Sequence, residues 1–119
     1  MSLGVVLGVG LLGGLGAVLR FAIEQAITLR ARTAFPLGTL VVNLSGAIAL
    51  GVLAGAALSS DAYKIWGVGL LGGYTTFSAW MLETEELGVT GRRAFAALNI
   101  IISLVFGVLG AYAGRTLAS

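Results

Sequence analysis

The sequence predicts an all-α integral membrane protein with four transmembrane helices. Of its 119 residues, 58% are hydrophobic and only 10% are charged, whereas a water-soluble domain carries about 25% charged residues. The apolar residues are gathered into four long blocks, and a helix needs about 20 such residues to cross the hydrocarbon core of a bilayer. Most of the charged residues lie in the short connections between blocks. These observations indicate a single integral membrane domain over residues 1–119, surrounded by a lipid bilayer.

The four expected spans cover approximately residues 3–29, 37–58, 65–86 and 94–115. The first is free of charge from Leu3 to Leu19 and then continues through Arg20 and Glu24. The second contains no charged residue, and the third has none before Glu83. The fourth is uncharged until Arg115 at its end. Each block therefore resembles a hydrocarbon-spanning helix more closely than a buried helix of a soluble protein.

The composition excludes several classes of function. The chain contains no Cys and no His, which removes disulfides, thiolate chemistry, zinc sites and imidazole acid–base catalysis. A Ser-His-Asp triad cannot be assembled without His. The net charge of +2 is too small to indicate a nucleic-acid partner. We therefore expect neither an enzyme nor a nucleic-acid-binding protein.

The loop charges bear on the orientation of the chain in the membrane. Four spans place both termini on one side, with the first and third loops on the other. The loop side holds four arginines and the terminal side holds two basic residues: Arg30, Arg32, Arg92 and Arg93 against Lys64 and Arg115. The positive-inside rule places the loop side in the cytoplasm of a multi-pass protein of the cell inner (plasma) membrane. Because the margin is small, the sequence is also compatible with insertion in both orientations.

Polar side chains inside the second and fourth spans are candidates for function, because each needs a hydrogen-bond partner in lipid. Thr39 and Asn43 are four residues apart and share a helix face. They form either an interhelical clasp or the wall of a polar pathway. Asn99, Ser103 and Gly107 continue the same spacing along the fourth span. This second stripe is either a helix interface or part of a pathway.

The third span contains its least helix-favouring stretch, GGYTTFSAW, at Gly72–Trp80. Gly72 and Gly73 each cost about 1 kcal/mol in a helix interior, and the β-branched Thr75 and Thr76 are also weak helix formers. The span is either continuous or broken in the middle of the membrane. A break frees carbonyl oxygens that protein or an ion must satisfy, and such oxygens favour a small cation such as Na⁺.

Two aromatic residues follow the weak helical stretch. Phe77 and Trp80 are three residues apart and stand on one helix face. The edges of aromatic rings carry partial positive charge, so two edges directed into a polar slot form a mild anion site without a fixed cation. The alternative is that both rings face lipid or the core, as most aromatic residues in membrane helices do.

Two motifs together resemble the Fluc (CrcB) family of small fluoride channels: GVGLLGGYTTFSAW at residues 67–80 and PLGTLVVNLSG at residues 36–46. The chain length and the four-span layout fit the same family. The resemblance implies a fluoride-selective channel for passive, electrodiffusive export of F⁻, which relieves fluoride toxicity. It also implies an antiparallel, dual-topology homodimer with two fluoride pores. The resemblance further implies that the third helix is broken in the middle of the membrane. At this break the backbone carbonyls of Gly72 and Thr75, contributed by both subunits, hold a structural Na⁺ at the centre of the dimer.

The resemblance also assigns site residues along the anion pathway and at its mouth. It implies that Phe77 and Trp80 line the pore, that Asn43 donates to the anion, and that the hydroxyls of Ser103 and Thr76 extend the polar track. The polar stripes described above add Thr39 and Asn99 to this pathway. Arg20 is implied near a vestibule, where it draws anions in.

The chain departs from the family pattern at two places. Trp80 stands where the family usually has a second Phe. Its indole keeps a positive edge and adds an N–H donor, so contact with an anion is retained in principle. The indole is also bulkier, which leaves slower conduction or a silent pore as alternatives to normal conduction. Asn99 and Gly107 stand where the family often has Tyr and Ser or Gly. With the loop-charge asymmetry, these departures allow pairing with an oppositely oriented sister subunit as an alternative to a homodimer.

Two other functions are weighed against the channel. A four-helix, proton-coupled exporter of the small multidrug kind needs a titratable carboxylate within a span. Glu24 lies four residues after Arg20, where an ion pair is the simpler account, and Glu83 lies at the end of the third span. The second alternative is a non-conducting subunit of a hetero-paired channel.

Overall fold

The computed structural model describes residues 1–119 and contains only helices. In chain order these are α1 (Leu3–Ala31), α2 (Leu37–Gly55), α3 (Ser60–Tyr63), η1 (Lys64–Leu71), α4 (Gly72–Tyr74), α5 (Phe77–Val89) and α6 (Arg93–Ala118). The all-α prediction is therefore confirmed. By length and composition, α1, α2 and α6 can each cross a membrane. The long axis of the molecule is 48 Å, close to the ~40–45 Å of a bilayer with its headgroup layers.

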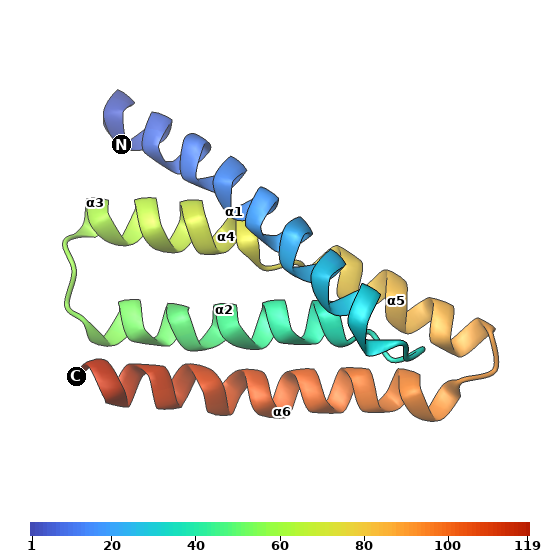
Figure 1. The fold of residues 1–119 in the computed structure, drawn as a ribbon. Coiled ribbons are helices and arrows are strands. Elements are labelled where there is room, and N and C mark those ends of the chain that lie inside the picture. The colour runs from blue at the N-terminus through green and yellow to red at the C-terminus, as the bar shows by residue number, and fades with distance from the viewer.

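The remaining expected crossing, residues 65–86, is assembled from shorter pieces. The π-helix η1 joins α3 to α4, and Figure 1 shows the three as one rod that ends in a short non-helical link before α5. The link consists of Thr75 and Thr76, both in extended backbone conformation. Residues 65–86 therefore do not form one uninterrupted α-helix, in contrast to α1, α2 and α6.

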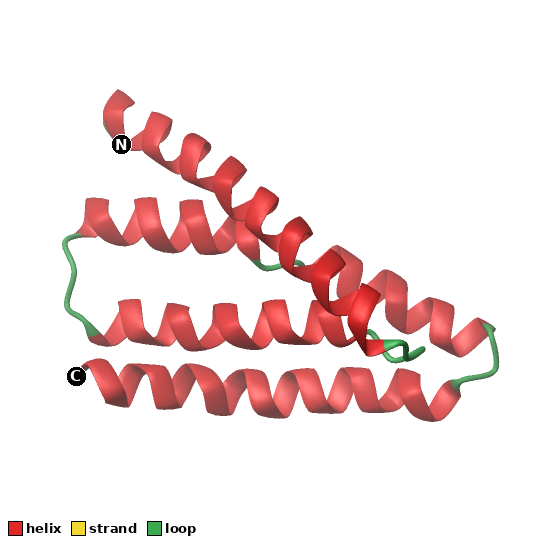
Figure 2. Cartoon of the chain, in the orientation of Figure 1, coloured by secondary structure: helices red, strands yellow, loops and turns green.

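The rod and α1 run in one direction along the molecule, while α2 and α6 run in the other (Figure 1). Both chain termini and the α2–α3 loop lie at the same end of the molecule (Figures 1 and 2). The α2 helix packs along α6, α1 lies across η1 and α4, and α5 packs on the first part of α6. The loops that join α1 to α2 and α5 to α6 lie together at the opposite end.

Glycines set how closely the helices approach. A Cβ atom at Gly51 on α2 would collide with the main-chain oxygen of Ala111 on α6, and one at Gly73 on α4 would collide with that of Gly13 on α1. Such backbone-to-backbone contact is how small residues hold helices together in lipid. In contrast, a Cβ at Gly14 would meet nothing within 4 Å. Only some of the glycines are therefore used for helix packing within one chain.

The single chain leaves most of its apolar surface uncovered. Only 12 of 119 residues are buried, and the buried hydrophobic side chains are Val5, Val42 and Leu87. Large apolar residues such as Leu11 and Leu117 are exposed. A water-soluble monomer does not expose apolar surface on this scale. The apolar surface and the three long helices confirm the membrane-spanning character expected from the sequence.

Candidate functional site

The structure concentrates polar groups around the link between α4 and α5. Thr75 has φ −83° and ψ 157°, and Thr76 has φ −145° and ψ 119°. Thr76 then caps the next helix, because its Oγ1 accepts a hydrogen bond of 3.2 Å from the N–H of Ala79. The local sequence explains this change of direction, since threonine hydroxyls form N-caps and β-branched residues favour extended backbone.

Asn43 on α2 holds the link in place. Its Nδ2 donates to the Thr76 carbonyl at 2.9 Å, and its Oδ1 accepts from the Thr76 N–H at 2.9 Å. The amide thus satisfies both backbone polar groups of a non-helical residue, which cannot remain unpaired in lipid. This is the interhelical clasp that the sequence left as one of two options. A primary amide has a second N–H, and donation from that hydrogen to an anion stays a prediction.

Two carbonyls near the link lose their ordinary helical donors. In a continuous helix the N–H of Thr76 would bond to the Gly72 carbonyl, but it donates to Asn43 instead. The N–H of Ala79 would bond to the Thr75 carbonyl, but it donates to the Thr76 hydroxyl. The two carbonyls that the family resemblance assigns to Na⁺, those of Gly72 and Thr75, are therefore both released from the helical pattern.

A cavity of about 350 Å³ borders the link and is here called the break cavity. It is lined by uncharged residues: Asn43, Gly46, Ala47, Leu50, Gly67, Leu71, Gly72, Thr75, Thr76, Phe77 and Trp80. Phe77 is 70% exposed. The Phe77 and Trp80 rings meet edge to face, with centroids 5.7 Å apart and an interplanar angle of 79°. The break cavity thus brings six of the predicted site residues together: Asn43, Gly72, Thr75, Thr76, Phe77 and Trp80.

The Trp80 indole is tied to α6. Its Nε1–H donates to the main-chain carbonyl of Asn99 at 3.1 Å. The extra donor that distinguishes this residue from Phe is therefore used within the chain and is not directed at an anion.

Asn99 lies in the contact between α5 and α6, and Ser103 follows four residues later on α6. Asn99 is completely buried, and its Nδ2 donates to the Thr84 hydroxyl at 2.9 Å. Asn99 Oδ1 and Ser103 Oγ are buried without a hydrogen-bond partner. Neither Asn99 nor Ser103 is among the residues that line the break cavity. A continuous polar track from Asn43 to Ser103 stays a prediction.

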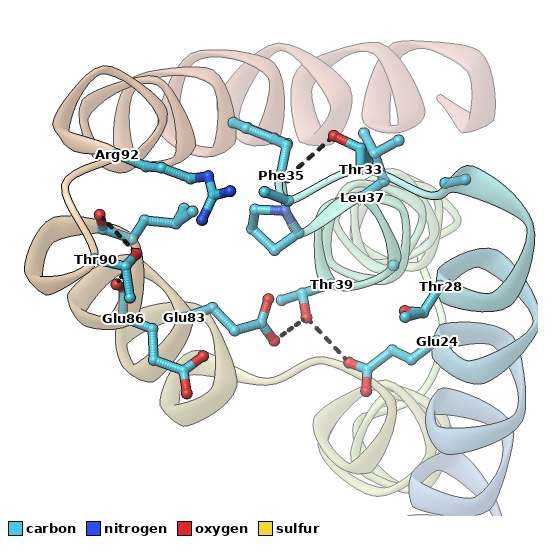
Figure 3. A pocket seen from close by; sticks show the side chains of 15 residues that line it. Glu24, Thr28, Thr33, Phe35, Leu37, Thr39, Glu83, Glu86, Thr90 and Arg92 are labelled. Atoms are coloured by element: carbon cyan, nitrogen blue, oxygen red, sulfur yellow. Dashed lines mark hydrogen bonds between the residues drawn. The ribbon is translucent and has the colours of Figure 1, made fainter.

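Thr39 lies in a second cavity, of about 560 Å³, here called the loop-end cavity. Its lining combines the loop before α2, the start of α2 and the ends of α1 and α5: Glu24, Thr28, Ala31, Thr33, Ala34, Phe35, Pro36, Leu37, Gly38, Thr39, Glu83, Glu86, Leu87, Thr90 and Arg92. Thr39 Oγ1 lies 2.7 Å from Glu83 Oε1 and 3.4 Å from Glu24 Oε1. Figure 3 shows the two carboxylates reaching this hydroxyl from opposite sides. A hydroxyl has one hydrogen, so it donates to one carboxylate at a time, and the 2.7 Å distance favours Glu83.

Arg20 forms an ion pair with Glu24, with its Nη1 atom 3.5 Å from Oε2 of Glu24. This confirms the pairing expected from their four-residue spacing. Arg20 is not among the residues lining either cavity. Its assignment to a vestibule stays a prediction.

The sequence analysis missed two features of these sites. It did not include Thr84 among the site residues, and it did not predict the hydrogen bond between Thr39 and Glu83. Thr84 lies four residues after Trp80, on the same face of α5, and this spacing was the available signal. The Glu83–Thr39 hydrogen bond joins residues 44 positions apart. No periodicity within a single helix could have indicated it.

The chain is similar to proteins of one family across nearly its whole length. Residues 7–115 match the family model described as CrcB-like protein, Camphor Resistance (CrcB). The protein "Fluoride-specific ion channel FluC 2" of Mycolicibacterium paratuberculosis is 52% identical over 93% of this chain and 91% of its own length. The proteins of that name from Mycobacterium tuberculosis strain H37Rv and from Haloarcula marismortui are 45% and 44% identical. These matches cover 99% and 86% of this chain, and 94% and 83% of the respective relatives.

Proposed function

The chain belongs to the CrcB-like family, and from this premise we propose that it is a fluoride-selective ion channel and not an enzyme. The observation that carries the proposal is the 52% identity, over 93% of the chain, to a protein named a fluoride-specific ion channel. The uncharged, donor-bearing break cavity supports it independently, because its chemistry suits an anion that must bind and then leave.

The chemical task of such a channel is to replace the water around a small, strongly hydrated anion. Asn43 offers its second amide N–H and Thr76 its hydroxyl, and Phe77 and Trp80 offer ring edges of partial positive charge. Ser103 extends these donors toward α6. None of these groups carries a full positive charge, so none holds the anion too tightly for release. These residues constitute the proposed anion pathway, and Arg20 draws anions toward it.

Transport is passive in this proposal, and the direction follows from the membrane potential. A potential that is negative inside drives a univalent anion outward with about 2.3 kcal/mol per 100 mV. A channel in the cell inner membrane therefore lowers cytoplasmic fluoride, and relieves its toxicity, without a coupled energy source. Neutral hydrogen fluoride that enters and dissociates in the cytoplasm is the source of the trapped anion.

The proposal includes a structural Na⁺ bound by the carbonyls of Gly72 and Thr75. These two oxygens have lost their helical hydrogen-bond donors and are suitable ligands for Na⁺, because membrane proteins use the carbonyls of unwound helix segments to bind this ion. The cation would fix the non-helical link by coordinating carbonyl oxygens that have lost their helical hydrogen-bond donors. One chain offers only two such oxygens, so a second chain completes the site.

That second chain is proposed to be an oppositely inserted copy, in an antiparallel, dual-topology homodimer. Phe77 is exposed and the break cavity opens at the surface of the chain. Both observations support a second chain that covers this surface. An oppositely oriented sister subunit would satisfy the same geometry. The homodimer and the hetero-pair can be distinguished experimentally, since only the homodimer conducts when this chain is reconstituted alone.

The test is fluoride efflux from liposomes that contain only the purified chain, followed with a fluoride electrode after valinomycin shunts the potential. We expect rapid fluoride efflux, no chloride efflux, and loss of the fluoride flux in Phe77→Ile. Phe106→Ile is the matched control, because Phe106 is an exposed phenylalanine on α6 that borders neither cavity. Normal flux in Phe77→Ile would remove Phe77 from the pathway. The absence of flux from the unaltered chain, restored by an oppositely oriented partner, would identify a subunit of a hetero-paired channel.

One observation keeps a second candidate in view. Glu24 and Glu83 converge on the buried Thr39 hydroxyl, and a titratable carboxylate within the membrane domain is what a proton-coupled exporter of the small multidrug kind requires. Cationic amine transport driven by a pH gradient, with no fluoride flux in the same liposomes, would favour that exporter.

A further inference from the structure

We propose that Thr84 and Asn99 are positioning residues for the Trp80 indole. They keep its N–H against α6 while the rest of the ring borders the break cavity. The role of this arrangement in conduction rests on the proposed fluoride pathway. The arrangement itself can be tested without any fluoride measurement.

Three hydrogen bonds form a closed loop through these residues. The Trp80 Nε1–H donates to the Asn99 carbonyl at 3.1 Å, and the Thr84 hydroxyl donates to the Trp80 carbonyl at 2.7 Å. Asn99 Nδ2 donates to Thr84 Oγ1 at 2.9 Å. The loop therefore links both the backbone and the side chain of Trp80 to α6.

The chemistry of Thr84 fixes the orientation of the Asn99 amide. A threonine hydroxyl has one hydrogen, and that hydrogen is used at the Trp80 carbonyl. Thr84 must then accept from its other neighbour, and only the NH₂ group of Asn99 can donate. Because Asn99 is fully buried, no solvent competes for these bonds.

The position of the indole N–H matters because fluoride is a strong hydrogen-bond acceptor. An N–H that turned into the break cavity would bind the anion more tightly than a ring edge does, and tight binding slows release from a channel. The Phe77 ring already restrains one side of the indole by its edge-to-face contact. The hydrogen bond to Asn99 restrains the other. Together they leave ring edges, and not an N–H donor, at the cavity.

The first test measures protection of the indole N–H directly. The chain has two tryptophans, so a Trp66→Phe background leaves a single indole cross-peak in a ¹H–¹⁵N spectrum. We expect hydrogen–deuterium exchange of this N–H to be about tenfold faster in Thr84→Val, and unchanged in Thr84→Ser. Thr116→Val is the control, because it removes a hydroxyl-to-carbonyl bond at the far end of α6.

Thr84→Val leaves the buried Asn99 amide without an acceptor and therefore risks misfolding. The double variant Thr84→Val with Asn99→Leu avoids this, because replacing both partners by apolar groups of similar shape leaves no orphaned donor. Faster exchange is expected in the double variant as well. Exchange as slow as in the parent chain in both variants would overturn the proposal.

The second test is a double-mutant cycle on fluoride flux. Thr84→Val is expected to lower the flux about tenfold in the Trp80 chain and to have no effect in a Trp80→Phe background, because a phenyl ring has no N–H to restrain. Equal losses in both backgrounds would overturn the positioning role, since they would reflect general packing. A folded chain that passes no fluoride, either alone or with an oppositely oriented partner, would instead refute the proposed function, while the exchange measurement would still decide the hydrogen-bond loop.

Discussion

The two cavities of this chain differ in the kind of polarity they contain. The break cavity beside Thr75 and Thr76 is lined only by neutral residues, whereas the loop-end cavity includes Glu24, Glu83 and Glu86 together with Arg92. The difference follows from the cost of burying charge in hydrocarbon, which is far larger than the cost of burying a hydrogen-bonded amide or hydroxyl. Neutral donors therefore gather at the helix interruption, and ionisable groups gather near the loops.

Two polar side chains of α2 form different kinds of hydrogen bond in the two cavities. In the break cavity, Asn43 pairs with the backbone of Thr76. In the loop-end cavity, Thr39 pairs with the side chain of Glu83. The first pairing replaces missing helical hydrogen bonds, and the second secures a carboxylate. Loss of the first should accordingly cost more than loss of the second.

The largest expected effect comes from Asn43→Leu. This change orphans both the N–H and the carbonyl of Thr76, and each unsatisfied buried group costs about 1–3 kcal/mol, so we expect a loss of about 2–6 kcal/mol in the free energy of unfolding in detergent. Ser45→Ala is the control, because it removes a side-chain hydroxyl from the same helix without orphaning a backbone group of the link. Equal stabilities of the two variants would mean that Asn43 does not support the link.

A smaller effect is expected from Thr39→Val in the loop-end cavity. It removes a 2.7 Å hydrogen bond to the Glu83 carboxylate, and bonds to charged groups contribute about 1.5–3 kcal/mol. Thr39→Ser keeps the hydroxyl and should retain most of the stability. The stabilities of the parent chain, Thr39→Val and Thr39→Ser are compared by thermal unfolding in the same detergent. A larger loss than that of Asn43→Leu would reverse the ranking of the two cavities.

The smallest effect is expected from Arg20→Gln. The Arg20–Glu24 pair is an i,i+4 contact of 3.5 Å, and such pairs contribute about 0.3–0.5 kcal/mol. The free energy of unfolding should change by no more than this. At low salt the initial rate of fluoride efflux should be lower in the variant than in the parent chain, and this difference should disappear as salt is added, because salt screens the attraction of anions to Arg20 in the parent. A salt-independent flux would contradict the steering role of Arg20.

Several features of the fold and site were predictable from the sequence. The all-helical, membrane-spanning character follows from composition and from the length of the apolar blocks, since both properties belong to short windows of chain. Of the four weak helix formers noted in GGYTTFSAW, Thr75 and Thr76 are the two that leave the helical conformation, whereas Gly72 and Gly73 stay helical. The Arg20–Glu24 ion pair follows from helical spacing in the same way. The resemblance of two motifs indicated the family that the full-length similarity confirms.

The partners of the polar residues were decided only by the tertiary structure. Spacing left Asn43 between a clasp and a pathway, and the packing of α2 against the link gave its amide to Thr76, 33 positions away. Packing of α5 on α6 likewise placed the Trp80 N–H on the Asn99 carbonyl. A sequence states which groups need partners in lipid, because that need follows from each residue's own chemistry and from burial. Which group meets the need depends on how separate helices approach one another, and only the folded arrangement contains that information.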